Sequence, residues 1–192
     1  MAENVTCPEI KDILSENECL ENFGGLGVNV YVFIKSDLAA PLKPEAGKNT
    51  YAALTAASFK KGKGLFKFEC QDGGQGHTWE SLGYRQGFKQ TLDYVLESVS
   101  ADSAYVARGL NNLKCGYIIE DGDKSILVYD KQHDFKYDSG NIKGDTGKKP
   151  EDARTVTLSG SLSPTAYGRY EIAEPESGWD SLLSGVGTAG EV

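Results

Sequence analysis

A β-hairpin near the middle of the chain is the feature that most constrains the fold. An apolar run at residues 115–120 is followed by Asp121-Gly122-Asp123 and by a second apolar run at 124–129. An Asp-Gly pair between two such runs favours a tight turn, because glycine readily adopts the positive φ that this turn needs. A hairpin alone is barely stable in water, so we expect it to belong to a larger antiparallel sheet.

Further strands are predicted from alternating apolar residues bounded by turn residues. In residues 28–34 both sides of the strand are apolar, with Val30 and Val32 on one side and Tyr31 and Phe33 on the other, which predicts a strand buried on both faces. The chain has 23 glycines, a content that fits many turns. The other predicted strands are residues 65–70, 84–96, 135–138, 154–160 and 167–172.

One helix is predicted, at residues 100–113. Ser100 is a suitable N-cap, and apolar residues then recur at helical spacing. This stripe consists of Val106, Leu110 and Leu113. Gly116 lies just beyond and is expected to end the helix. Together these elements predict a mainly β fold: an antiparallel β-sandwich or half-barrel with one flanking α-helix, a long loop and an extended N-terminal arm.

The chain divides into one domain with extensions at both ends. Residues 1–22 are mostly polar and are expected to form an N-terminal arm, and residues 23–173 the β domain. Within that domain, residues 35–58 are expected to form a long loop that leaves the core, because a connection of this length is usually functional. Residues 174–192 are rich in glycine and serine and are expected to be a flexible C-terminal segment.

Charge and cysteine usage exclude several classes of protein. The net charge of −8 does not suit a protein that wraps DNA, which needs a basic face. The first 15 residues lack the apolar stretch of a secretory signal, and no apolar run is long enough to cross a membrane. The four cysteines follow no zinc-binding spacing and are expected to be reduced and buried or incidental.

The sequence shows no constellation of catalytic residues. His77 and His133 stand alone in polar segments and are expected to be solvated loop residues. The glycine-rich segment 71–76 lacks the ending of a phosphate-binding loop, and the residues after Asp121 do not continue as a calcium loop. We therefore expect a protein that is not an enzyme and has no cofactor or metal.

A small basic cluster lies at Lys60, Lys61 and Lys63, with Phe59 and Phe66 nearby. Basic and aromatic residues together are a minimal footprint of nucleic-acid binding. The acidic net charge and the lack of a wider basic stripe favour instead a solvated turn or a charge contact between subunits.

The order of features resembles a known family. Cys19 and the run 24–31 open the first strand, and the helix, the hairpin, the segment 137–140 and the run 153–160 follow. This order resembles virion structural proteins of Bacteroidetes-type phages and prophages and is similar, more broadly, to the tail tube proteins of long-tailed bacteriophages. The resemblance implies hexameric rings that stack into a tube, through which DNA passes without specific binding.

The resemblance also implies partners, a location and candidate contact residues. The partners would be further copies of the chain and other tail or head proteins, with no membrane involved, and the location would be a phage tail assembled in the bacterial cytoplasm. Acids facing the lumen would be Glu69, Asp93 and Glu97, although Val95 shares the face of Asp93. Contacts between rings would come from the long loop, with Lys35, Pro41, Pro44 and Tyr51 as candidates.

Three other readings remain open at the level of sequence. The first is that the chain is another virion component, such as a head decoration, tail terminator or connector protein. The second is that the chain is a β-sandwich module that binds a ligand such as a carbohydrate, with Trp79 and Trp179 as candidates for a stacking platform. The third is that the chain is an enzyme whose active site the sequence does not reveal.

Overall fold

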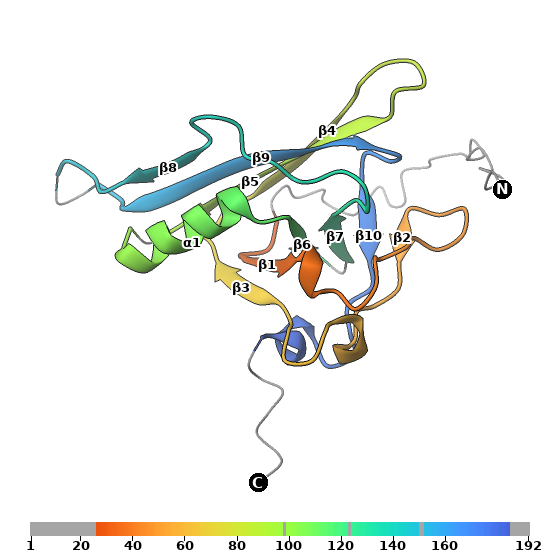
Figure 1. Ribbon diagram of the computed structural model, residues 1–192. Helices are drawn as coiled ribbons and strands as arrows, with labels where there is room; N and C mark the ends of the chain where they lie inside the picture. Colours follow the sequence, from red (N-terminus) through yellow and green to blue (C-terminus); the bar gives the residue numbers. More distant parts are fainter. Residues whose placement is uncertain (1–25, 98, 123, 150–151, 185–192) are drawn as a thin grey trace, which may run out of the picture.

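The computed structural model describes residues 26–97, 99–122, 124–149 and 152–184 and shows two packed β-sheets with one α-helix (Figure 1). The predicted mainly β, sandwich-like fold is confirmed. The six-stranded sheet has the order β2-β10-β7-β6-β1-β3, and the four-stranded sheet the order β4-β5-β9-β8. The strands are β1 Asn29–Ile34, β2 Thr50–Tyr51, β3 Phe66–Glu69, β4 Gly76–Ser81, β5 Phe88–Leu96, β6 Cys115–Asp121, β7 Lys124–Val128, β8 Ile142–Asp145, β9 Thr155–Thr165 and β10 Tyr170–Ile172. The helix is α1 Ala101–Asn112, and the 3-10 turns are η1 Lys35–Asp37, η2 Ala56–Ser58 and η3 Trp179–Leu182.

The six-stranded sheet separates two hydrophobic cores. Val30 and Val32 of β1 contribute to the core between the two sheets, and Tyr31 and Phe33 to a second core on the opposite face. All four side chains are almost fully buried, which confirms the prediction of a strand buried on both faces. Successive side chains of a strand point to opposite faces, so one short strand serves both cores.

The long loop of residues 35–58 covers the second core. It was expected to leave the core, and that expectation is wrong: Leu38, Tyr51 and Leu54 are buried within it. Tyr51 also belongs to β2, which pairs in parallel with β10. The apolar face of the six-stranded sheet must be shielded from water, and the loop supplies the side chains that do so.

The chain beyond β10 completes the same core. Trp179 in η3 is 1% exposed, and its indole Nε1 donates a hydrogen bond to Ser125 Oγ at 3.1 Å. The prediction of a flexible segment is therefore wrong for residues 174–184, because a large aromatic side chain anchors them. Residues 185–192 and the predicted arm, residues 1–22, lie outside the described residues.

The predicted hairpin and helix are both present. Strands β6 and β7 pair from Tyr117–Val128 to Asp121–Lys124, with Gly122 at a φ of 58° in the turn. The hydroxyl of Ser100 accepts a hydrogen bond from Ser103 N and caps α1. The expectation that Gly116 ends the helix is wrong: Leu113 is the C-cap, and Gly116 lies inside β6, where the Phe33 ring leaves no room for a side chain.

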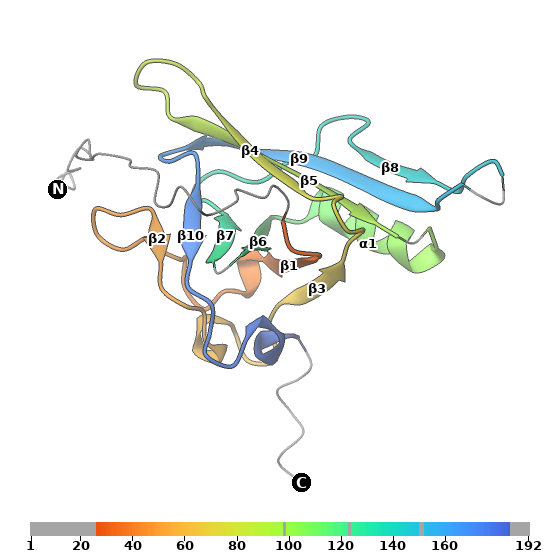
Figure 2. The same ribbon diagram turned by 180° about the vertical axis from the view of Figure 1, so that it is seen from behind.

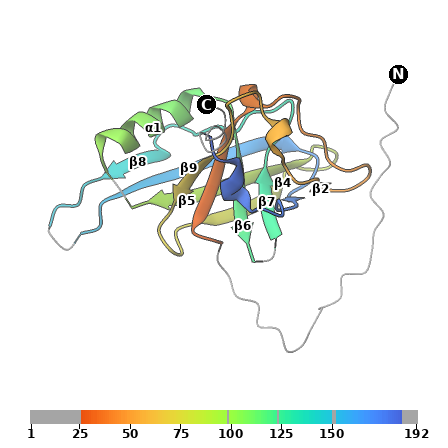
Figure 3. The same ribbon diagram turned by 90° about the horizontal axis from the view of Figure 1, so that it is seen from below.

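The four-stranded sheet contains most of what the sequence did not reveal. Strands β4 and β8 were not predicted, and residues 135–138 form only an isolated bridge, between Lys136 and Ser161. The six-stranded sheet and α1 lie on the same side of this sheet (Figure 2). Seen from below, α1 and β8 lie at one end of the molecule and β2 at the other (Figure 3).

Candidate functional site

The surface of the four-stranded sheet that faces away from the core is the first candidate site. We call it the outer face. Leu92 and Tyr94 of β5 are fully buried on the inner side, so their neighbours Thr91 and Asp93 lie on the outer face. The register continues this face across the sheet, and hydroxyl side chains dominate it. These are Thr78 of β4, Thr91 of β5, and Thr155, Thr157, Ser159 and Ser161 of β9.

Charges on the outer face are few and nearly balanced. Glu80 and Lys89 form an ion pair at 3.4 Å, and Lys143 and Asp145 of β8 add one charge of each sign. Asp93, one of the three predicted lumen acids, lies beside Ser159 on this face and forms no ion pair with a described residue. Lys136, which bridges to Ser161, adds a cation. The outer face therefore offers hydroxyl groups and balanced charges rather than the excess of cations that holds phosphates.

Both edges of the four-stranded sheet are open. Strands β4 and β8 are the outermost strands, and no described strand pairs with their outer edges. An unpaired edge presents backbone N–H and C=O groups that can bind a strand of another chain. Beyond β4 the hairpin to β5 projects from the molecule (Figure 1) and carries Tyr84, which is 85% exposed. The interaction that this sheet offers most directly is therefore pairing of its edge strands with a strand of another chain.

The other two predicted lumen acids lie elsewhere. Glu69 is at the end of β3, in the six-stranded sheet, and therefore does not share the outer face with Asp93. Glu97 follows the last residue of β5. Glu69 and Glu97 together line a hollow of about 830 Å³ where the ends of β3 and β5 meet. The structure thus brings these two acids together and places Asp93 apart from Glu69.

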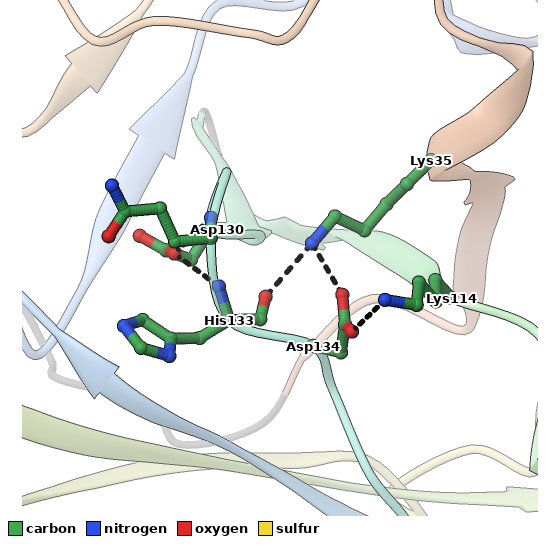
Figure 4. A network of polar contacts seen from close by, with 6 residues as sticks. Lys35, Lys114, Asp130, His133 and Asp134 are labelled. Carbon is green, nitrogen blue, oxygen red and sulfur yellow. Dashed lines mark hydrogen bonds and ion pairs between the residues drawn. The ribbon is translucent and has the colours of Figure 1, made fainter.

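The four predicted loop contacts have different surroundings. Pro41 and Pro44 are exposed, whereas Tyr51 is 7% exposed and packs edge-on against Tyr170. Lys35 belongs to a polar network rather than to the surface (Figure 4). Only the two prolines present their side chains freely in the single chain.

The network of Lys35 joins three distant segments of the chain. Lys35 Nζ contacts Asp134 Oδ1 at 2.8 Å and donates to the His133 carbonyl oxygen at 2.9 Å, and Lys114 Nζ contacts Asp134 Oδ2 at 2.7 Å. Burial alone would raise the pKa of Asp134, but hydrogen bonds from Lys114 and Lys35 lower it below the usual range. In Figure 4 the ring of His133 points away from the two lysines. The geometry fits a structural tie and does not assemble a nucleophile with a base.

The two histidines differ from each other, and His77 differs from its prediction. His77 lies in β4, largely buried, with Nε2 3.4 Å from Gln90 Oε1. Burial lowers the pKa of this imidazole. The expectation of a solvated loop residue is therefore wrong for His77, because β4 itself was missed. No group of three or more His, Cys, Asp or Glu residues suited to a metal occurs in the described part of the chain.

The predicted stacking platform does not form. Trp179 is in the second core, while Trp79 lies on β4, 56% exposed, with its ring against Phe88 and over Gly168. The two indoles therefore lie in separate parts of the fold, one in the second core and one on the four-stranded sheet, and only Trp79 is accessible. A single partly covered indole is a weak sugar-stacking surface.

Comparisons with known proteins give no match to this chain. Neither protein-family models, nor curated proteins, nor solved structures give a significant match. Among the described residues, no helix is long and apolar enough to cross a membrane. The hydroxyl-rich outer face carried one signal that sequence reasoning missed: in residues 155–162, Thr and Ser occupy every second position, and Val, Leu and Gly lie between them.

Proposed function

We propose that the chain is a structural subunit that assembles into rings, in the manner of a bacteriophage tail tube protein. The single observation that carries this proposal is the four-stranded sheet: no described strand pairs with either of its edges, and one of its faces is rich in hydroxyl groups. Two open edges on one sheet allow each copy to pair with two neighbours, which is the requirement for a closed ring.

Pairing β4 of one copy with β8 of the next would join the sheets into one continuous barrel. The inner side of each sheet is already filled by its own core, so the outer face is the side left to line the bore. Hydroxyl groups with few unpaired charges would let a polyanion pass without capture, because sustained binding of phosphates needs fixed cations. On this proposal Asp93 remains a lumen residue, and the assembly belongs to the virion of a phage or to a phage-derived particle.

Cysteine cross-linking tests the pairing of β4 with β8. Thr78→Cys and Lys143→Cys place thiols on the outer face at the two edges, in a background where Cys7 and Cys19 are serine. Cys70 and Cys115 stay in place, because they are buried and burial raises the pKa of each thiol to about 11. Only the thiolate forms disulfides readily. A second pair, Thr78→Cys with Asp145→Cys, covers a shift of pairing by two residues.

The proposal predicts a ladder of disulfide-linked species that stops at the size of the closed ring. Each single-cysteine variant serves as a matched control and should give no ladder, because β4 of one copy meets β8 and not β4 of the next. Dimers from Thr78→Cys alone would show symmetric pairing of two β4 edges and would overturn the proposal. Absence of cross-links from both double variants, with the fold intact by circular dichroism, would also overturn it.

A further inference from the structure

The lysine turn at residues 60–63 concentrates positive charge at one end of an acidic protein. Residues 35–63 contain six lysines and two carboxylates, in a chain of net charge −8. The turn closes with a hydrogen bond from Lys63 N to the Lys60 carbonyl oxygen, and Gly62 has a φ of 73°. Lys61 is exposed and forms no ion pair with a described residue, whereas Lys60 Nζ donates a hydrogen bond to the Ser36 carbonyl oxygen at 2.7 Å and Lys63 Nζ lies 3.6 Å from Asp37 Oδ2. The turn therefore projects a cationic tip.

The hollow between the ends of β3 and β5 has the opposite character. Its volume is about 830 Å³, and its walls include the apolar side chains of Val28, Phe68 and Leu96. Val28 is 40% exposed, so part of this apolar surface faces water. The carboxylates on the hollow belong to Glu69, Asp72 and Glu97, and none of them forms an ion pair with a described residue. Lys67 is the one cation among the described residues that line the hollow, and it is paired with Asp180 at 3.0 Å.

These two features lie at opposite ends of β3. The turn precedes the strand and Glu69 ends it, and the extended strand alone separates them by about 13 Å. Strand β3 is fixed in register against β1, so a chain cannot fold its own turn back into its own hollow. An occupant with the chemistry of this turn must come from another molecule.

We infer that the lysine turn of one copy docks in the acidic hollow of a second copy. The turn carries three lysines and one carboxylate, Asp37, and so keeps an excess of positive charge that meets the three carboxylates of the hollow. The aliphatic stems of the lysines cover the apolar walls, as lysine stems do at partly buried sites. Each copy carries one turn and one hollow, so the contact is head-to-tail and can repeat from one copy to the next. The inference rests on the proposed function in one respect: in a ring-forming protein this contact would stack the rings.

Charge reversal on each side tests the contact. One variant carries Lys60→Glu, Lys61→Glu and Lys63→Glu, and a second carries Glu69→Lys, Asp72→Lys and Glu97→Lys. A control with Lys131→Glu, Lys136→Glu and Lys148→Glu makes the same change of charge at exposed lysines away from the turn. Self-association is measured by sedimentation velocity at low salt and at about 1 M salt, where the screening length is about 3 Å.

The expected result is loss of salt-sensitive self-association in both triple variants and its retention in the control. A sixfold variant that combines both reversals restores complementarity and should associate again. Persistence of the salt-sensitive association in either triple variant, or its failure to return in the sixfold variant while that variant remains folded, would overturn the inference. The β4–β8 cross-linking ladder is read on the same variants: a normal ladder without salt-sensitive association shows that rings form but do not stack, whereas loss of the ladder shows that ring formation itself has failed.

Discussion

Replacement of Trp179 should unfold the second core, although the sequence places this residue in a glycine- and serine-rich tail. The indole is 1% exposed, and its ring lies 6.1 Å from that of Tyr31. Complete removal of a buried tryptophan side chain typically costs about 3–5 kcal/mol. We therefore expect Trp179→Ala to lower the free energy of unfolding by that amount. An unanchored tail residue would cost less than about 0.5 kcal/mol.

A double-mutant cycle with Ser125 isolates the hydrogen bond within this total. Trp179→Phe leaves the buried Ser125 hydroxyl without its donor, and Ser125→Ala leaves the indole N–H without its acceptor. Each orphaned polar group costs about 1–3 kcal/mol. The double variant has neither group, so its loss of stability should be smaller than the sum of the single losses by about 1 kcal/mol or more.

Urea unfolding followed by far-ultraviolet circular dichroism measures these differences without relying on tryptophan fluorescence. Trp79→Phe is the matched control, since the chain has two tryptophans and this one is 56% exposed. It should cost clearly less than Trp179→Phe. Equal costs for the two tryptophans, or strictly additive effects of Trp179→Phe and Ser125→Ala, would refute the assignment of residues 174–184 to the core.

Two further predictions concern close packing and pH. Gly116→Ala should destabilise the protein by about 1–3 kcal/mol in the same urea assay, because its Cβ would collide with the ring of the buried Phe33. A neutral effect would contradict the packing of β6 on β1. Burial lowers the pKa of His77 below its unfolded value of about 6.5, so the unfolded state binds more protons and stability falls as the pH drops below about 6.5. Relative to His77→Gln, the wild type should lose stability as the pH falls through about 6.5, and an identical pH dependence of both proteins would count against the partly buried position of His77.

Much of the fold could be predicted from local patterns. The hairpin at Gly122 and the helix capped by Ser100 were predicted because their signals lie within a few adjacent residues. The burial of both faces of β1 could also be predicted, since its apolar residues occupy both faces. These features depend on intrinsic conformational preferences and on simple periodicity.

The remainder depends on contacts between distant residues. Strand β4 is mostly polar, and residues 78–81 are exposed, so the strand lacks a clear alternation of apolar and polar residues. Its extended conformation is fixed by pairing with β5. Leu54 and Trp179 lie in segments typical of loops, yet both pack against the apolar face of the six-stranded sheet. The same limit applies to the candidate site: Glu69 and Glu97 meet at one hollow only because Cys70 bridges to Leu96.

Electron microscopy of the purified chain, with mass measurement on the same sample, tests the central claim most directly. The proposed pairing of β4 with β8 predicts closed rings or hollow tubes in end view, with a mass that is a fixed multiple of 20.7 kDa. Rings that persist at high salt while their stacks dissociate would match both the edge pairing and the charged contact. A monomer at every protein and salt concentration would contradict the assembly function.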